Sequence, residues 1–419
     1  VKPNVLGVSE RSIVDEHLNW TEHIQNQKQR EMEAVKQDLL KKMTDLDLKE
    51  VRRLWAAHES YYNPKAVTKK LIESSLAYLK VSLLEEVSTR KYEAIMNAVQ
   101  KGQPLSEHSR PGPLQLVIAT TWRSGSTFLE ELLASHPAVY NHYEPLMQFD
   151  LHQVRDGGDA LKAQKLVHDL LSCSYNSESE YMKKAKEIRD MFQRNTRIWK
   201  VCKTEEWGEG LCYNDSFLKQ ACKLFPWSTM KLVRLRLNLL EPVLQDASLN
   251  VKVIYLVRDP RGVMNSRSAT VQWCKTADCN DPALLCQDMD SDLTAAIKLK
   301  NKYPQQIYIL RYEDLALNPI NKTHELLDYL KFELDSNIEE FLKSHTTTNY
   351  DKPWSTKRES STRVTYWSTK LSAPRLKEIQ DSCVAVMKKF GYLTVNSTKE
   401  VTSVNKILAP VNLMEYTVT

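Results

Sequence analysis

The segment Arg123-Ser-Gly-Ser-Thr127 combines a permanent cation with three hydroxyl side chains and a glycine. It follows a short apolar run at residues 114–120 and precedes a helix-like pattern at 128–135, which should end before Pro137. A strand that turns through such residues into a helix points free backbone N–H groups at an anion. The segment therefore predicts a phosphate-type site, although an ordinary helix N-cap would use the same residues.

A second basic segment follows the apolar run at 251–257 and contains Arg258 and Ser266. Arg258 would lie at the carboxyl end of this strand, and Pro260 suits the first turn of the next helix. Ser266 would then lie about two turns into that helix, where it and Arg258 would converge on a second phosphate. The alternative for Arg258 is an ion pair with Asp259 or another carboxylate.

The other basic residues are weaker indicators of a binding site. Lys231 and Arg234 would end a further strand on the same rim, where they could contact a sulfate or an acidic glycan, or form strand-end salt bridges. Arg261 and Arg267, taken singly, are expected to be solvated surface charges. A polar loop is expected to be a solvated charge run, or else to close over an adenosine; its basic residues are Lys352, Lys357, Arg358 and Arg363.

Two familiar nucleotide-binding patterns are absent or weak. The Walker A pattern GxxxxGK[ST] is missing because no Gly-Lys pair occurs, so Mg²⁺-ATP chemistry and a kinase lose their main support. Asp288-Met-Asp290 is a DxD, which glycosyltransferases use with a metal, but it lies among ordinary helix-like residues. We expect no metal site.

Apolar runs that are short and rich in β-branched residues recur along the chain at 114–120, 230–235, 251–257 and 307–310. Each is followed by a helix-like segment, which is typical of a parallel sheet covered on both faces. The expected fold is α/β: a P-loop-like three-layer architecture with a central parallel sheet flanked by helices. Ligands of such sheets bind outside the carboxyl ends of the strands.

The first hundred residues differ from the rest. They contain heptad-like apolar steps from Met32 to Leu46 and a second amphipathic stretch at 71–99, which together predict an N-terminal helical extension. They form a stem or a dimerising coiled coil, or they pack on the main domain. We expect an extension at 1–103, a catalytic domain at 104–400 and a C-terminal tail at 401–419.

Composition excludes several classes of protein. The 419 residues are 42% hydrophobic with a net charge of +5, which argues against global disorder and against nucleic-acid binding. No run approaches 18 apolar residues, so no segment of this sequence should span a membrane. The chain begins at Val1, and a signal or anchor upstream of it is one expectation.

The eight cysteines and four glycosylation sequons favour a secretory compartment. The count of cysteines is even and no pair has CxxC spacing, as expected of a disulfide framework rather than a zinc ribbon; reduced core cysteines are the alternative. The candidate glycosylation sites are Asn19, Asn214, Asn321 and Asn396.

Together the two basic segments resemble those of the Golgi carbohydrate sulfotransferases that act on the 6-O position of galactose, N-acetylgalactosamine or N-acetylglucosamine. The family's 5′-phosphosulfate loop resembles Thr121-Trp-Arg-Ser-Gly-Ser-Thr127, and its 3′-phosphate segment resembles Leu256-Val-Arg-Asp-Pro-Arg-Gly-Val with Ser266-Arg267. The resemblance covers roughly residues 114–395. Further matching blocks are Tyr143-Glu-Pro145, Lys231-Leu-Val-Arg-Leu-Arg236, Arg311-Tyr-Glu-Asp-Leu315 and the ending Trp367, Ile379-Gln, Cys383 and Gly391-Tyr392.

The resemblance implies 3′-phosphoadenosine 5′-phosphosulfate (PAPS) as co-substrate, without a metal, and a glycan or proteoglycan acceptor in the Golgi lumen. It implies that Arg123 stabilises the leaving phosphate and that Glu144 is the base, as in the related tyrosylprotein sulfotransferases; a structural glutamate is the alternative. Arg258 and Ser266 would hold the 3′-phosphate. The residues expected to bind the 5′-phosphosulfate are Thr121, Trp122, Arg123, Ser124, Gly125, Ser126 and Thr127.

Some departures and rivals remain. Asn141-His142 stands where the family is more apolar, which leaves the acceptor pocket open, and Gly262 and Thr127 are minor changes. The rival bases are His136, His142 and His152. Tyrosine sulfation and a non-catalytic glycan-binding relic of the fold are the alternative functions, and a type II membrane anchor and a homodimer through the N-terminal helices are further expectations.

Overall fold

The computed structural model describes residues 67–87, 89–104, 110–203, 208–270, 273–332, 334–346 and 360–411. The chain divides into two compact units, one of residues 1–67 with 204–210 and the other of residues 68–203 with 211–419. Nearly all described residues belong to the second unit, which contains the sheet. The predictions for Asn19, for the heptad-like steps and for Lys352, Lys357 and Arg358 lie outside the described residues.

A single five-stranded sheet forms the centre of the second unit, with the strand order β2-β3-β1-β4-β5 and all pairs parallel. Four of these five strands coincide with or overlap a predicted apolar run, and the remaining strand, β2, lies outside those runs. The parallel sheet predicted from the sequence is therefore confirmed. The strands are β1 (Leu114–Ala119), β2 (Val139–His142), β3 (Trp227–Leu232), β4 (Asn250–Val257) and β5 (Ile307–Arg311).

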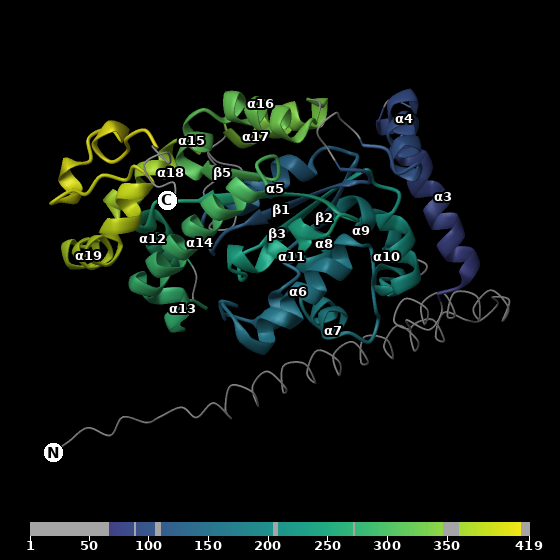
Figure 1. Ribbon diagram of the computed structural model, residues 1–419, viewed down its shortest axis with the longest axis horizontal. Coiled ribbons are helices and arrows are strands. Elements are labelled where there is room, and N and C mark those ends of the chain that lie inside the picture. The colour runs from purple at the N-terminus through teal and green to yellow at the C-terminus, as the bar shows by residue number, and fades with distance from the viewer. Residues whose placement is uncertain are drawn as a thin grey trace, which may run out of the picture. The chain divides into compact units, whose positions relative to one another are not determined.

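Helices lie on both sides of this sheet (Figure 1), as the expected three-layer architecture requires. The α-helices are α3 (Lys69–Glu86), α4 (Thr89–Gln100), α5 (Ser126–Ala134), α6 (Gly157–Leu171), α7 (Glu180–Glu187), α8 (Asp190–Gln193), α9 (Thr196–Cys202), α10 (Asp215–Cys222), α11 (Glu241–Gln245), α12 (Pro260–Thr270), α13 (Ala277–Asn280), α14 (Pro282–Lys302), α15 (Tyr312–Leu317), α16 (Pro319–Leu330), α17 (Ser336–Thr346), α18 (Thr362–Thr365) and α19 (Ala373–Lys389). Short 3₁₀ turns are η2 (Met147–Phe149), η3 (Gly210–Tyr213), η4 (Leu237–Leu240), η5 (Tyr366–Thr369), η6 (Thr398–Glu400) and η7 (Val404–Lys406).

The core lies between the sheet and these helices. Strand β1 is buried along its whole length, because helices cover both of its faces, and its continuous Leu-Gln-Leu-Val-Ile-Ala sequence reflects this. The helices α5, α12 and α15 each begin just after a strand, so their first turns gather at the carboxyl edge of the sheet. This edge is where the residues singled out from the sequence come together.

The helices α3 and α4 pack on the sheet-containing unit. Helix α3 contacts α9 and α10, and the Tyr92 hydroxyl of α4 donates to the carbonyl of Leu224 at 2.7 Å. This part of the N-terminal region therefore packs on the main domain, which was one of the expected alternatives. The segment after residue 400 also packs back, since the Leu393 amide donates to the Ile407 carbonyl at 2.9 Å. The division at residues 103 and 400 stays a prediction.

All eight cysteines form disulfides, as the hypothesis of an oxidised framework expects. The bridge Cys286–Cys383 joins α14 to α19 and closes a loop of 97 residues. The remaining pairs are Cys173–Cys222, Cys202–Cys212 and Cys274–Cys279. In the described part of the chain, no helix is both long and apolar enough to cross a membrane.

Candidate active site

The turn between β1 and α5 is built around Gly125. This residue is the N-cap of α5 with φ +84°, and no side chain of the described residues caps the helix start, so backbone N–H groups of the first turn are available to an anion. A Cβ at Gly125 would lie 2.4 Å from the Tyr312 ring. Only glycine fits both this backbone conformation and this contact, and the ring of Tyr312 forms the other wall of the turn.

The two basic segments meet at this turn. The Nε of Arg123 donates to the Oγ of Ser266 at 3.0 Å, and a terminal nitrogen of Arg258 donates to the Arg123 carbonyl at 3.0 Å. The Arg258 guanidinium also lies over the Tyr312 ring, 4.6 Å from its centroid. Among the described residues Asp259 pairs with Arg261 rather than with Arg258, and the carboxylate that interacts electrostatically with Arg258 is Glu313.

The backbone is strained at two of the predicted site residues. Arg123 has φ +71° and Glu144 has φ +41°, a region that side-chain-bearing residues seldom adopt. Such conformations cost about 1–3 kcal/mol each and cluster at functional sites. Asp150 adopts a similar conformation, with φ +48°.

A cavity of about 960 Å³ opens along this edge of the sheet. Six cationic side chains line it against two carboxylates, so the described wall favours an anionic ligand. The cations are Arg123, Arg194, Arg234, Arg258, Arg363 and Lys370, and the carboxylates are Glu144 and Asp150.

Glu144 is held by two cations. One carboxylate oxygen lies 3.2 Å from the Lys231 Nζ, and the other lies 2.8 Å from a terminal nitrogen of Arg234. Burial raises the pKa of Glu144, but Lys231 and Arg234 outweigh it and hold this pKa below its usual value. The carboxylate is therefore ionised at neutral pH and is in the form that can accept a proton.

Lys231 and Arg234 differ in access. Arg234 lines the cavity, whereas Lys231 is fully buried and is not among the lining residues. The Lys231 ammonium lies 3.0 Å from Glu130, 3.2 Å from the Thr127 hydroxyl and 3.7 Å from the centre of the Tyr143 ring. For Lys231 the structure shows the strand-end salt bridge, which was the alternative to contact with an acidic substrate.

The predicted phosphate-binding residues separate into two groups. Trp122, Ser126 and Thr127 line the cavity with Arg123 and Gly125, but Thr121 and Ser124 do not. The Ser124 hydroxyl donates to the Thr121 carbonyl at 2.7 Å, and the Thr121 hydroxyl accepts from Arg267 at 2.7 Å. These two side chains hold the turn together from behind.

The expectation that Arg261 and Arg267 are solvated surface charges is wrong, because both are fully buried. Arg261 pairs with Asp259 at 2.8 Å. Arg267 donates to the Cys279 carbonyl at 2.9 Å and to the Trp122 carbonyl at 3.2 Å. Both face inward because α12 packs against α13 and α19, so their guanidinium donors satisfy buried oxygens of the surrounding segments.

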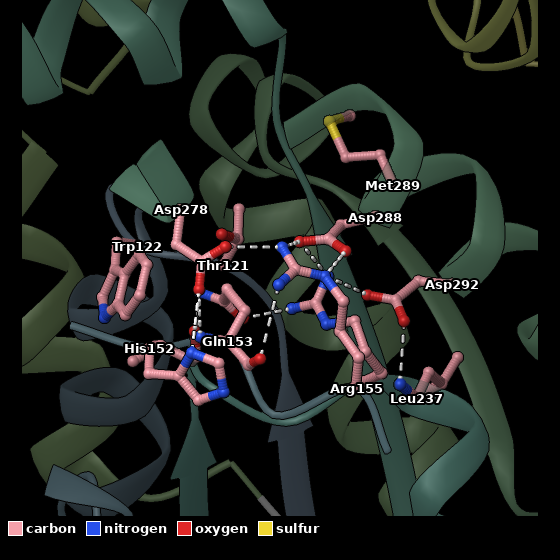
Figure 2. Close-up of polar contacts among 12 residues, drawn as sticks. Thr121, Trp122, His152, Gln153, Arg155, Leu237, Asp278, Asp288, Met289 and Asp292 are labelled. Carbon is pink, nitrogen blue, oxygen red and sulfur yellow. Dashed lines mark hydrogen bonds and ion pairs between the residues drawn. The ribbon is translucent and has the colours of Figure 1, made fainter. Parts of the chain in front are cut away.

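An ion-pair network joins Arg155 to acidic residues of α13 and α14 (Figure 2). Arg155 donates to Asp288 at 2.8 and 2.9 Å and pairs with Asp278 at 2.8 Å. Arg236 continues the network, lying 3.1 Å from Asp292. The DxD pattern is thus divided: Asp288 belongs to this network, while Asp290 pairs with Lys389.

The structure gives no support to a metal-binding role for the DxD pattern. Among the described residues, no group of three or more His, Cys, Asp or Glu side chains is placed to hold a metal ion. The ion pairs of Asp288 and Asp290 account for both carboxylates.

None of the three rival histidines lines the cavity. His142 is buried on β2, and burial lowers its pKa to about 3. The ring of His136 packs on Trp227, and the His136 Nδ1 accepts from the Ala138 amide at 3.1 Å. His152 pairs with Asp278 at 3.2 Å (Figure 2). Asn141, like His142, is buried in β2, so these departures from the family pattern do not line the cavity.

Several cavity residues were not singled out from the sequence. Tyr312 was noted only as part of the family-like block Arg311–Leu315, and nothing in its spacing indicated that its ring packs over Gly125. Arg194 follows the short helix α8 and reaches the site through the Tyr143 ring, 5.1 Å away, so only the tertiary fold places it there. Further examples are Asn265, Trp273, Tyr366 and Lys370.

A comparison with known families identifies the chain. Residues 115–336, just over half of the sequence, match the profile described as "Sulfotransferase family". The chain belongs to the sulfotransferase family. This sulfotransferase is therefore an enzyme, and its matched region contains β1, the turn at Gly125, Glu144 and Arg258.

Curated relatives agree with the family. The sulfotransferase is 28% identical to carbohydrate sulfotransferase 1 of Mus musculus, over 68% of this chain and 80% of that protein. It is 24% identical to carbohydrate sulfotransferase 6 of Homo sapiens, over 70% of this chain and 86% of that protein. Among solved structures, the sulfotransferase domain from the Synechococcus PCC 7002 olefin synthase is 18% identical and covers 67% of this chain and 97% of that chain, with a TM-score of 0.38.

Proposed function

We propose that this sulfotransferase moves a sulfuryl group from PAPS to a hydroxyl group, the 6-O, of a galactose, N-acetylgalactosamine or N-acetylglucosamine residue in a glycan or glycosaminoglycan. The observation that carries the proposal is the meeting of Arg123, Ser266 and Arg258 beside a cavity that Glu144 also lines. One anion site at a helix start suits many nucleotides. Two adjoining sites suit a nucleotide with phosphates at both the 5′ and the 3′ positions.

The residues present fit such a donor. The open N–H groups at the start of α5, with Ser126 and Thr127, would take the 5′-phosphosulfate. Arg258 and Ser266 would take the 3′-phosphate, since both line the same cavity from the carboxyl end of β4 and from α12. PAPS would supply the sulfuryl group, and no metal is assigned to the reaction.

The transfer forms one bond and breaks another. The acceptor oxygen would attack sulfur as the bond from sulfur to the 5′-phosphate oxygen breaks, and the acceptor proton would pass to Glu144. The products would be a sulfate ester and adenosine 3′,5′-bisphosphate (PAP). Arg123 would stabilise the negative charge that grows on the leaving phosphate. Arg234 would keep Glu144 aimed into the cavity through its 2.8 Å ion pair.

The acceptor assignment is supported by the names of the curated relatives, which are carbohydrate sulfotransferases. It is tested by acceptors that lack the reacting group. Glycans whose 6-hydroxyl is replaced by hydrogen should receive no sulfate, whereas their parents should. Transfer to a tyrosine peptide instead would favour the tyrosylprotein-type alternative, and PAP binding without any transfer would favour the non-catalytic relic.

We also propose that the enzyme works in the Golgi lumen, held there by an N-terminal anchor and able to dimerise through its N-terminal helices. The four disulfides support an oxidising compartment. Asn321 and Asn396 are exposed and open to a glycan, whereas Asn214 caps α10 by accepting from the Phe217 amide at 2.9 Å. Mass spectrometry of protein from a secretory host should find paired cysteines and glycan on Asn321 or Asn396. Free thiols and bare asparagines would contradict this.

A further inference from the structure

A second glutamate lies behind the proposed base. Glu130 is on α5, one turn after the phosphate turn, and its side chain has no exposed surface. Its carboxylate lies 3.0 Å from the Lys231 Nζ. A buried carboxylate is costly unless a cation compensates it, so Lys231 is what makes a charge at Glu130 tolerable.

Lys231 therefore lies between two carboxylates. Its Nζ is 3.0 Å from Glu130 and 3.2 Å from Glu144, and all three side chains are buried or nearly so. One ammonium cannot fully neutralise both carboxylates, and the dielectric of a buried site makes their competition strong. The charge state of Glu130 must consequently influence how firmly Lys231 holds Glu144.

We propose that Glu130 is a positioning residue that shares Lys231 with Glu144 and thereby sets how strongly Glu144 attracts a proton. This inference rests on the proposed role of Glu144 as base. With Glu130 ionised, Lys231 is divided between two carboxylates and Glu144 becomes the stronger base. With Glu130 neutral, Lys231 belongs to Glu144 alone, which becomes the weaker base.

The switch between these two states falls near neutral pH. Burial, together with the charge of Glu144, raises the pKa of Glu130 to about 7 against the opposing effect of Lys231. As pH rises through this value Glu130 loses its proton, and Glu144, already ionised, gains basicity. General-base catalysis improves with the basicity of the base, so turnover should rise over the same window.

The groups around Glu130 and on the helix that packs against α5 come from four segments. From β3 comes Lys231, and from β2 and the turn after it come Asn141, Tyr143 and Glu144. Helix α17 packs on α5 through Phe341 against Phe128. Arg194 also interacts electrostatically with Glu130. The titratable side chains of α17 are Glu339, Glu340, Lys343 and His345.

The test follows the ionisation of Glu144 directly and does not depend on turnover. In the full chain with ¹³C-labelled glutamate carboxyls, the Glu144 signal, assigned by its loss in Glu144→Gln, should show a second inflection near pH 7 as Glu130 titrates. Glu130→Gln should abolish this inflection and leave the main Glu144 titration in place, because Glu130 is already neutral at the pH where Glu144 takes up its proton. A Glu144 titration in the wild type without an inflection near pH 7 would overturn the proposal, even if Glu130→Gln failed to fold.

The rate profile gives the second readout. Wild-type turnover at saturating substrate should rise several-fold between pH 6 and 8, and Glu130→Gln should be flat there. Asp292→Asn removes another buried carboxylate whose pKa is raised, to about 6, but which pairs with Arg236, and it should keep the rise. Glu130→Asp should restore part of the rise. If Glu144→Gln kept full turnover while the Glu144 signal still showed the inflection, the base assignment would fail and the coupling would stand.

Discussion

The guanidinium Nε of Arg123 donates a hydrogen bond to the Oγ of Ser266 at 3.0 Å, joining residues 143 positions apart. One belongs to the turn after β1, the other to the helix after β4. The contact ties the two proposed phosphate sites into one unit. A ligand that fills one site therefore finds the other already in place, which lowers the ordering cost of binding.

The first prediction concerns the 3′-phosphate. Isothermal calorimetry should show that PAP binds at least about tenfold more tightly than 5′-AMP, a difference of about 1.4 kcal/mol or more. Arg258→Ala should remove most of this difference, because the guanidinium that would face the 3′-phosphate is lost. Arg375→Ala, which truncates a surface arginine paired with Glu378, should preserve it. Equal affinity of the wild type for both nucleotides would remove the role assigned to Arg258 and Ser266.

The second prediction distinguishes two effects of replacing a glycine: backbone strain, which lowers stability, and distortion of the phosphate turn, which lowers PAP affinity. Gly125→Ala places a Cβ 2.4 Å from the Tyr312 ring, so the turn must distort and PAP affinity should fall by at least about tenfold. Gly157→Ala imposes a comparable strain at φ +70° with nothing within 4 Å, and should cost about 1–2 kcal/mol of stability without changing PAP affinity. Thermal unfolding measures the stability of both variants, and calorimetry measures their PAP affinity. Undiminished PAP binding by Gly125→Ala would show that the turn is not the phosphate site.

The third prediction concerns Glu144. Glu144→Gln keeps the shape of the side chain but cannot accept the proton, so turnover should fall by about 10²–10⁴-fold with little change in PAP affinity. Asp150→Asn removes a carboxylate from the same cavity wall, one whose side chain pairs with Lys184, and should retain nearly normal turnover. Steady-state rates and calorimetry measure the two effects. A joint loss of PAP affinity and thermal stability in Glu144→Gln would make the glutamate a structural residue.

The fourth prediction is a dependence of stability on pH. Burial and the nearby Asp259 raise the pKa of Glu313 from 4.5 to about 7. Between these values the folded protein binds more protons at Glu313 than the unfolded chain, so the free energy of unfolding should fall as pH rises from 4.5 to 7. Urea unfolding at several pH values should show this fall, and a smaller one in Glu313→Gln. An identical slope in both proteins would contradict the assignment.

Much of the fold could be predicted because its signals are local. The apolar runs that became β1, β4 and β5 are continuous and rich in β-branched residues, which a sheet buried on both faces requires. The turn at Gly125 could be predicted for the same reason, since strand, glycine and helix follow one another directly. Strand β3 begins three residues before the predicted run, and this start could not be predicted because Ser228 and Thr229 are polar but buried. The strand ends at Leu232.

The surroundings of the base could not be read from the sequence. Nothing in the spacing of Glu130 marks it as the partner of Lys231, 101 positions further on, because their contact depends on how α5 packs against β3. Arg261 and Arg267 were misjudged for a similar reason. A single arginine looks like a surface charge until the carbonyls and carboxylates that bury it are known.

The most direct test of the central claim is transfer of ³⁵S from labelled PAPS to a panel of desulfated glycans by the full-length wild-type protein. Label should appear in at least one glycan bearing galactose, N-acetylgalactosamine or N-acetylglucosamine, and Arg123→Ala should abolish it. A folded wild-type protein that binds PAP but labels no glycan in the panel would contradict the account.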